Sequence, residues 1–330
     1  MCLNFGYATF SISYYFNNLM NFSHELLDRL ERLQNKYTAM GQNMESYLDG
    51  LLYADFLTYW DYARLDTLLS LQQPRTSIPD EEIFILYHQI TELYFKLIIK
   101  AIAQVANTEN VSTTLFKRQL KRINAYFEQL IGSFGVMIEG MDREEFLQFR
   151  MSLLPASGFQ SAQYRMIELM STDVTNLVHH LKREELRASE ANIAEKMPFL
   201  YWRSGATELA TGKKTLTLQQ FEQKYGAKFD RLADEYATIN LAKCYEKLSP
   251  EDQADPELIH LLREHDLNAN VRWPLQHYKS AVRYLDKKPT EVAATGGTNW
   301  QKYLPPKNQR IIFYRNLWTD TELDEWGKFV

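Results

Sequence analysis

The longest apolar stretch of the chain covers residues 81–103, EEIFILYHQITELYFKLIIKAIA. Pro79 and three carboxylates at 80–82 lie at its beginning, where a proline fits the first turn and negative charge stabilises the positive end of a helix dipole. Apolar side chains then fall on nearly every face, which predicts a helix buried on most sides. Because Glu92 and Lys96 interrupt it and no second such segment follows, we interpret it as a core helix and not a membrane span.

Four further segments have apolar residues every three or four positions with polar residues opposite, the pattern of amphipathic helices. They cover residues 23–37, 112–130, 159–170 and 271–284. No segment shows the sustained alternation of apolar and polar residues that a half-buried strand requires. The pattern therefore predicts an all-α protein, a multi-helix bundle.

Two local patterns predict where helices begin and end. Gly132 and Gly135 predict a turn after the helix at 112–130, because glycine is the commonest residue at such breaks. Asp142 precedes the next apolar run, with Glu145 three residues later, which is the spacing of a capping box. A helix is therefore expected to begin at Asp142.

Composition narrows the class of protein. The chain has 330 residues, 45% hydrophobic and 24% charged, as in folded globular proteins. Its net charge of -5 argues against a general nucleic-acid binder, which would carry a basic surface. Cys2 and Cys244 are too few for a disulfide framework or a thiolate metal site, and this scarcity is typical of a reducing cytoplasm. Any metal site must therefore use histidine or carboxylate.

Residues 1–20 differ from the rest because they are aromatic and uncharged. A secretory signal would begin with basic residues and end at a small-residue cleavage site, so we do not interpret them as one. Met20 directly precedes the amphipathic helix at 23–37, and the sequence leaves open whether translation begins at Met1 or Met20. We expect an N-terminal extension over 1–22 and a single all-helical domain over 23–330.

Only two of the seven histidines, His88 and His277, lie among apolar and aromatic residues on long predicted helices. His88 shares a helix stripe with Phe84, and His277 shares one with Trp273. A single such histidine is most often a core residue bonded to a neighbouring carbonyl. By contrast, His265 lies in the charged run LLREHD and is expected to be solvated.

Two such imidazoles in a helical, cysteine-poor protein favour a haem pocket, in which one histidine binds iron and the opposite side stays open for O2 or substrate. Zinc would need three or four ligands at close spacing, and the sequence offers none. Arg150 lies one turn beyond Phe146 on an apolar helix face. It is either a long side chain that reaches solvent or a guanidinium that binds a carboxylate.

Four segments together resemble the tryptophan 2,3-dioxygenase family. The pattern FxxxHQxxELxFKxII at 84–99 is similar to the family's histidine motif, and RWPLQH at 272–277 is similar to its W-x-x-x-H element. LTYWDYARLDTLLSLQQP at 57–74 resembles the segment with two tyrosines three residues apart. FLQFRMSLLPASGFQSAQYRMIE at 146–168 resembles the arginine segment and the Ser-Gly-Phe-Gln-Ser block that follows it. The four occur in the family's order along the chain.

The resemblance implies a bundle that encloses haem b with ferrous iron in the active state. His277 would be the proximal iron ligand, and His88 would meet the indole N–H of the substrate. The resemblance also assigns substrate-binding roles: Arg150 would hold the carboxylate, Phe84 and Phe146 would wall the site, Ser157 would line it near the haem, and Thr295 would contact the charged end of the amino acid. The family forms homotetramers, and Tyr59 and Tyr62 would reach the site from a neighbouring subunit.

The implied reaction opens the indole ring of L-tryptophan with O2 and gives N-formylkynurenine, in the cytoplasm and without a nucleic-acid or membrane partner. One loop departs from the family's pattern Gly-Thr-Gly-Gly-Ser-Ser-Gly, because this chain has Ala294, Thr298, Asn299 and Trp300 at the corresponding places. The loop closes over the substrate in the family. Two alternatives therefore stay open: a haem enzyme that oxidises another aromatic amino acid or indole, and a haem-binding protein without turnover.

Overall fold

A computed structural model describes residues 22–54, 57–153, 158–206, 213–285 and 305–328. Over these ranges the regular structure is helical, and Val178 and Leu200 form an isolated antiparallel bridge. The predicted all-α class is confirmed. The chain forms two compact units, one ending at Leu71 and one beginning at Gln72. The expected single domain over 23–330 stays a prediction.

The first unit contains α2 (His24–Ala39), α3 (Met44–Leu52), α4 (Tyr59–Ala63) and α5 (Leu65–Leu68). Ser23 accepts a bond from the Leu26 amide and begins α2, near the predicted start at 23. Gly41 has a φ of 66° and ends it, since the Gln42 amide bonds back to the Tyr37 carbonyl at 2.9 Å. This left-handed position favours glycine because a side chain would be strained there.

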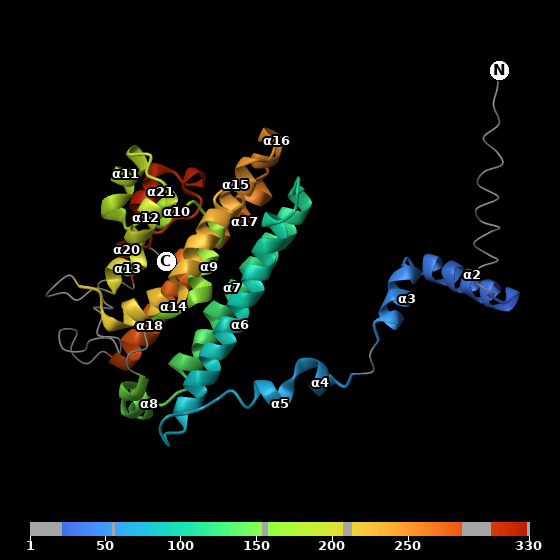
Figure 1. Cartoon of the computed structure of the whole chain (residues 1–330), viewed down its shortest axis with the longest axis horizontal. Coiled ribbons are helices and arrows are strands. Elements are labelled where there is room, and N and C mark those ends of the chain that lie inside the picture. Colours follow the sequence, from blue (N-terminus) through green and yellow to red (C-terminus); the bar gives the residue numbers. More distant parts are fainter. Residues whose placement is uncertain (1–21, 55–56, 154–157, 207–212, 286–304, 329–330) are drawn as a thin grey trace. The chain divides into compact units, whose positions relative to one another are not determined.

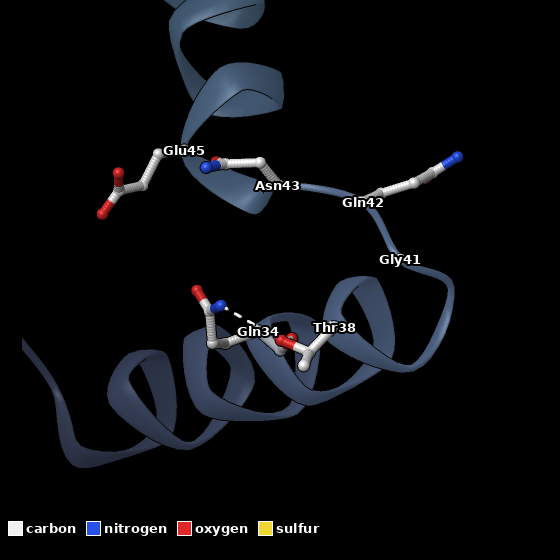
Figure 2. A pocket seen from close by; sticks show the side chains of 6 residues that line it. All are labelled: Gln34, Thr38, Gly41, Gln42, Asn43 and Glu45. Carbon is white, nitrogen blue, oxygen red and sulfur yellow. Dashed lines mark hydrogen bonds between the residues drawn. The ribbon is translucent and has the colours of Figure 1, made fainter.

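A shallow polar hollow lies where α2 turns into α3 (Figure 2). The Gln34 amide donates to the Thr38 hydroxyl at 3.3 Å along one wall, and Asn43 caps α3 along the other. The residues that line the hollow are neither aromatic nor basic, and none of them is a predicted site residue. Its lining comprises Gln34, Thr38, Gly41, Gln42, Asn43 and Glu45.

The second unit is built on two long helices, α6 (Asp80–Ala106) and α7 (Thr113–Ile138), which lie side by side (Figure 1). α9 (Ala162–Ser171) packs on α6, α17 (Pro256–Leu267) packs on α7, and α14 (Leu216–Tyr236) packs on α9. Their shared core is apolar and wholly buried, and it includes Phe95, Ile98, Ile102, Ile123 and Phe127.

Shorter helices complete the second unit around this core. They are α8 (Arg143–Phe149), η1 (Arg150–Leu153), η2 (Gly158–Gln160), α10 (Val174–Leu177), α11 (His180–Ala188), α12 (Ile193–Lys196), η3 (Met197–Phe199), α13 (Tyr201–Gly205), α15 (Leu241–Glu246), α16 (Pro250–Gln253), η4 (Asn268–Arg272), α18 (Trp273–Leu285), α20 (Pro306–Gln309), η5 (Arg315–Leu317) and α21 (Asp320–Asp324). Among the described helices, none combines the length and the hydropathy that a membrane span requires.

The turn expected at Gly132 and Gly135 is wrong. α7 continues to Ile138 because Phe134 and Met137 extend its buried stripe beyond Leu130. Tertiary packing thus outweighs the low helix propensity of glycine.

Of the two hydrogen bonds that define the capping box expected at Asp142, only the one accepted by the Asp142 side chain forms. The Asp142 carboxylate accepts the amides of Glu144 and Glu145 and begins α8 as predicted. The Glu145 carboxylate, however, accepts the amide of Asp80, at the start of α6, at 3.2 Å. The side chain expected to close the box instead joins two helices.

The prediction that the helix at 81–103 is buried on most sides is correct for one face. Phe95, Ile98 and Ile102 are inaccessible to solvent. On another face Ile90, Leu93 and Leu97 are 44%, 48% and 42% exposed. The sequence pattern overstated burial because it cannot tell which apolar face meets this chain's own core.

Candidate active site

The beginning of α6 is held by a buried carboxylate. Glu81 is 1% exposed and accepts bonds from the Arg75 amide at 2.8 Å and the Thr76 amide at 2.7 Å. Burial alone would raise the pKa of Glu81, but the bonds from Thr76 and Arg75 lower it below its usual value. The carboxylate is therefore charged at neutral pH and ties the segment before α6 to the first turn of the helix.

Two turns further along α6, His88 forms one hydrogen bond to the backbone. Its Nδ1 lies 2.7 Å from the Phe84 carbonyl oxygen. Because a carbonyl can only accept, the proton must lie on Nδ1, which leaves a lone pair on Nε2. His88 is exposed in the isolated chain, yet desolvation by surrounding protein atoms lowers its pKa. The ring is therefore a neutral hydrogen-bond acceptor at neutral pH.

Phe84 brings His88 against the predicted wall of the site. The Phe84 ring centroid lies 4.1 Å from that of His88, 6.1 Å from that of Phe146 and 5.8 Å from that of Phe149. Phe146 and Phe149 come from α8, and both are buried. The structure thus brings together three of the sequence-predicted residues, Phe84, His88 and Phe146.

His277 lies on α18, between aromatic rings from two helices. Its ring centroid is 6.3 Å from that of Phe134 on α7 and 6.0 Å from that of Trp273 on its own helix. Burial and, to a smaller extent, the nearby His88 together lower the pKa of His277 to about 4. His277 is therefore neutral at neutral pH, and the two imidazoles are near enough to repel each other when charged.

His88 and His277 border one apolar group of residues, which we call the aromatic cluster. Tyr87 links its two sides, because its ring lies 5.7 Å from that of His88 and 5.6 Å from that of Phe134. The cluster is buried and draws on α6, α7, α8 and α18. It consists of Tyr87, Phe134, Met137, Met141, Phe146, Phe149 and Tyr284.

Arg150 begins η1, immediately after Phe149. It is partly buried, and burial lowers its pKa below the usual value, although a guanidinium stays charged at neutral pH. Arg75 fixes the same turn, because its guanidinium donates to the Ser152 carbonyl at 2.9 Å. Arg150 thus directly follows the helix that carries the buried rings of Phe146 and Phe149.

The other predicted site residues lie elsewhere in the chain. Ser157 and Thr295 are outside the described residues. Tyr59 and Tyr62 belong to the first unit, on α4, where they are 74% and 80% exposed.

The prediction that His265 is solvated is wrong. His265 is wholly buried, and its Nδ1 lies 2.8 Å from the Tyr314 hydroxyl. Burial lowers its pKa to about 3. Its charged sequence neighbours misled the prediction, because the residues that cover it, such as Phe313, come from much further along the chain.

Sequence reasoning also missed Phe134 and Tyr284 as parts of the site. Phe134 follows Leu130 and Phe127 at helical spacing, a signal that the assumed turn at Gly132 obscured. Tyr284 packs on Phe146 at 4.6 Å between ring centroids. Tyr284 ends the predicted helix at 271–284, and the helix pattern alone does not show which residue of α8 it meets.

The side chains of the described residues do not gather into a site for a bare metal ion. Among the described residues, no three histidines, cysteines or carboxylates gather within reach of one ion. A haem iron needs only one or two protein ligands because the porphyrin supplies four nitrogens, and a neutral imidazole is a suitable ligand. The indole nitrogen of Trp273 is also buried with no hydrogen-bond partner in the described ranges. A group of apolar, aromatic residues bordered by two neutral histidines suits a porphyrin chemically.

Comparison with known proteins identifies the family. The family model for tryptophan 2,3-dioxygenase matches residues 49–183. The tryptophan 2,3-dioxygenase of a Bradyrhizobium species is 32% identical over 79% of this chain and 91% of its own length. That of a Polaromonas species is 31% identical over 79% and 86%, and tryptophan 2,3-dioxygenase 2 of Ralstonia nicotianae is 42% identical over 34% of each chain. Since the first match spans nearly the whole relative, the chain belongs to the tryptophan 2,3-dioxygenase family.

Proposed function

We propose that this enzyme binds haem b through His277 and opens the indole ring of L-tryptophan with O2, giving N-formylkynurenine. Membership of the family makes it an oxidoreductase. One observation carries the assignment of residues: two neutral imidazoles on different helices, His88 and His277, border one buried aromatic cluster.

His277 would hold the iron. Its depressed pKa keeps the nitrogen lone pair free of a proton at neutral pH, which iron binding requires. When bound, haem in the ferrous state supplies the iron that binds O2 and carries the oxygen chemistry.

His88 would orient the substrate. Its Nε2 lone pair can accept a hydrogen bond from the indole N–H, since the Phe84 carbonyl fixes the proton on Nδ1. The flat, apolar rings of Phe84 and Phe146 suit a planar indole and exclude water from it. The bond and the rings together hold the indole in one orientation.

Arg150 would bind the substrate carboxylate. A guanidinium presents paired N–H donors that match a carboxylate, and partial burial strengthens the attraction. Ser157 and Thr295 would complete the site, as the resemblance implies. The overall reaction breaks the C2–C3 bond of the indole and the O–O bond, and each of the two carbons receives one oxygen atom as a carbonyl.

We also propose a homotetramer located in the cytoplasm. The strongly exposed rings of Tyr59 and Tyr62 support a contribution from a neighbouring subunit, because large aromatic side chains on a protein surface are typical of interfaces. The two cysteines support a reducing compartment.

The experiment is haem reconstitution of the full chain and of His277→Ala, followed by absorption spectroscopy. The wild-type protein should bind one haem per chain, and His277→Ala should lose the imidazole-ligated spectrum. His260→Ala is the matched control, because His260 is an exposed histidine on the neighbouring helix α17. An unchanged spectrum in His277→Ala would exclude this residue as the ligand.

Turnover then separates the proposed function from its alternatives. L-Tryptophan under O2 should give the absorbance of formylkynurenine, whereas L-tyrosine and substituted indoles should react more slowly. Faster turnover of one of these compounds would indicate the enzyme with another substrate. Haem uptake without turnover of any of them would indicate a haem-binding protein.

A further inference from the structure

The helix that carries His277 contains an irregular turn directly before the site. α17, η4 and α18 follow one another without a break, and η4 (Asn268–Arg272) is a π-helix. The Trp273 amide bonds to the Asn268 carbonyl, five residues back, where an α-helix would use the carbonyl four residues back. The turn therefore contains one residue more than an α-helical turn.

Pro274 explains why the helix widens here. The Trp273 amide bonds to Asn268, and the next residue, Pro274, has no N–H to give. The Ala269 carbonyl therefore has no helical donor at the following position. A proline ring would also clash with the carbonyl four residues before it in a regular α-helix, which a wider turn avoids.

A side chain from another helix replaces the missing donor. The Tyr164 hydroxyl, on α9, donates to the Ala269 carbonyl at 2.7 Å. Tyr164 is buried, and its ring packs on Trp273 at 4.9 Å between centroids. The bond thus satisfies a buried carbonyl that the helix itself leaves without a donor.

A buried carboxylate, that of Asp266, also binds a residue of this turn. Asp266 is wholly buried and accepts the Asn270 amide nitrogen at 2.8 Å. It also accepts the backbone amides of Phe313 and Tyr314 and the indole N–H of Trp318, at 2.8, 3.1 and 3.0 Å. Asp266 thereby links Asn270, inside the turn, to the segment at 313–318.

The extra residue decides which side chain faces the site. Each residue of an α-helix turns the chain by roughly 100° about the axis. If η4 relaxed to an α-helical turn while α17 stayed in place, Gln276 would take the direction that His277 now has. The imidazole would then point away from Phe134 and from the aromatic cluster.

We propose that Tyr164 and Asp266 are positioning residues, which set the direction of His277 by holding the π-helical turn between them. Neither residue is needed to touch haem or substrate for this role. The inference rests on the proposed role of His277 as iron ligand, but the state of the turn is measurable without haem.

Tyr164→Phe tests it, because this change removes the hydroxyl and keeps the ring that packs on Trp273. Tyr245→Phe is a matched control: the Tyr245 hydroxyl also donates to a backbone carbonyl at 2.7 Å, that of Gln253, away from the turn. Hydrogen–deuterium exchange without haem should be roughly tenfold faster at residues 270–277 in Tyr164→Phe and unchanged there in Tyr245→Phe. Equal exchange in both variants would overturn the proposal.

The second measurement is the iron–imidazole stretching band of the ferrous, haem-loaded protein in resonance Raman spectra. It should shift or broaden in Tyr164→Phe and in Asn270→Ala, which removes the link to Asp266, and stay unchanged in Tyr245→Phe. An unmoved band in both turn variants refutes the positioning role and leaves the proposed function intact. If wild-type protein binds no haem, the proposed function fails, whereas the exchange measurement still decides the state of the turn.

Discussion

A single backbone carbonyl determines the chemistry open to His88. Because Nδ1–H donates to the Phe84 carbonyl, Nε2 is left as an acceptor, and desolvation keeps it unprotonated. His88 can therefore be both a histidine bonded to a neighbouring carbonyl and a functional histidine. The same bond that satisfies the ring also leaves Nε2 available to an indole N–H.

Arg150→Lys should weaken substrate binding and leave the haem spectrum unchanged. Lysine keeps the charge but loses the paired N–H donors that fit a carboxylate, so kcat/KM for L-tryptophan should fall roughly 10–100-fold, mainly through KM. Steady-state kinetics on haem-loaded protein measure this. Arg143→Lys, at the beginning of the preceding helix α8, is the control and should keep wild-type kinetics. Wild-type constants in Arg150→Lys would remove Arg150 from the site.

At the scale of helices, the sequence predicted beginnings better than ends. Pro79 and the carboxylates after it marked the start of α6 within one residue, because these signals act on the nearest backbone groups. The π-helical turn at 268–272 was not predicted, although Pro274 was visible in the motif RWPLQH. Its occurrence depends on Tyr164, a residue more than a hundred positions earlier, which supplies the missing donor.

The same contrast between local sequence signals and tertiary contacts holds for the site. Phe84, His88 and Phe146 were predicted and do lie together, since their spacing places them on apolar faces of α6 and α8. Phe134 and the burial of His265 were missed, because tertiary contacts decide both.

Glu81→Gln should loosen the beginning of α6 without changing the core. Three bonds reach this carboxylate, two of them from the amides of Arg75 and Thr76, and the neutral amide would weaken them. We expect a loss of roughly 1–3 kcal/mol in the free energy of unfolding. Urea denaturation measures it, with Glu82→Gln, at an exposed neighbouring position, as the control. Equal stability of the two variants would contradict the prediction.

Across the whole second unit, buried histidine makes stability depend on pH. The pKa of His265 is about 3 in the folded chain and near 6.5 when unfolded. Between these values the unfolded chain binds a proton that the folded chain does not. The free energy of unfolding should therefore fall as pH drops below about 6.5, by at most about 1.4 kcal/mol per pH unit from this residue.

Urea denaturation of wild type and His265→Gln at pH 7 and pH 5 tests this dependence. The loss of stability on acidification should be smaller in His265→Gln than in wild type. His260→Gln, at an exposed position on the same helix, should follow wild type. Parallel behaviour of all three proteins would show that His265 does not titrate as expected.

The Asp266 carboxylate also has a consequence for how the protein is made. Phe313, Tyr314 and Trp318, which donate to it, leave the ribosome well after His277 does. Until they arrive, the carboxylate stays hydrated and the helix end beside it is not locked. Assembly of the His277 helix is therefore completed only after the segment at 313–318 has been made, so a cofactor that enters later meets a finished site and one that enters earlier meets a loose one.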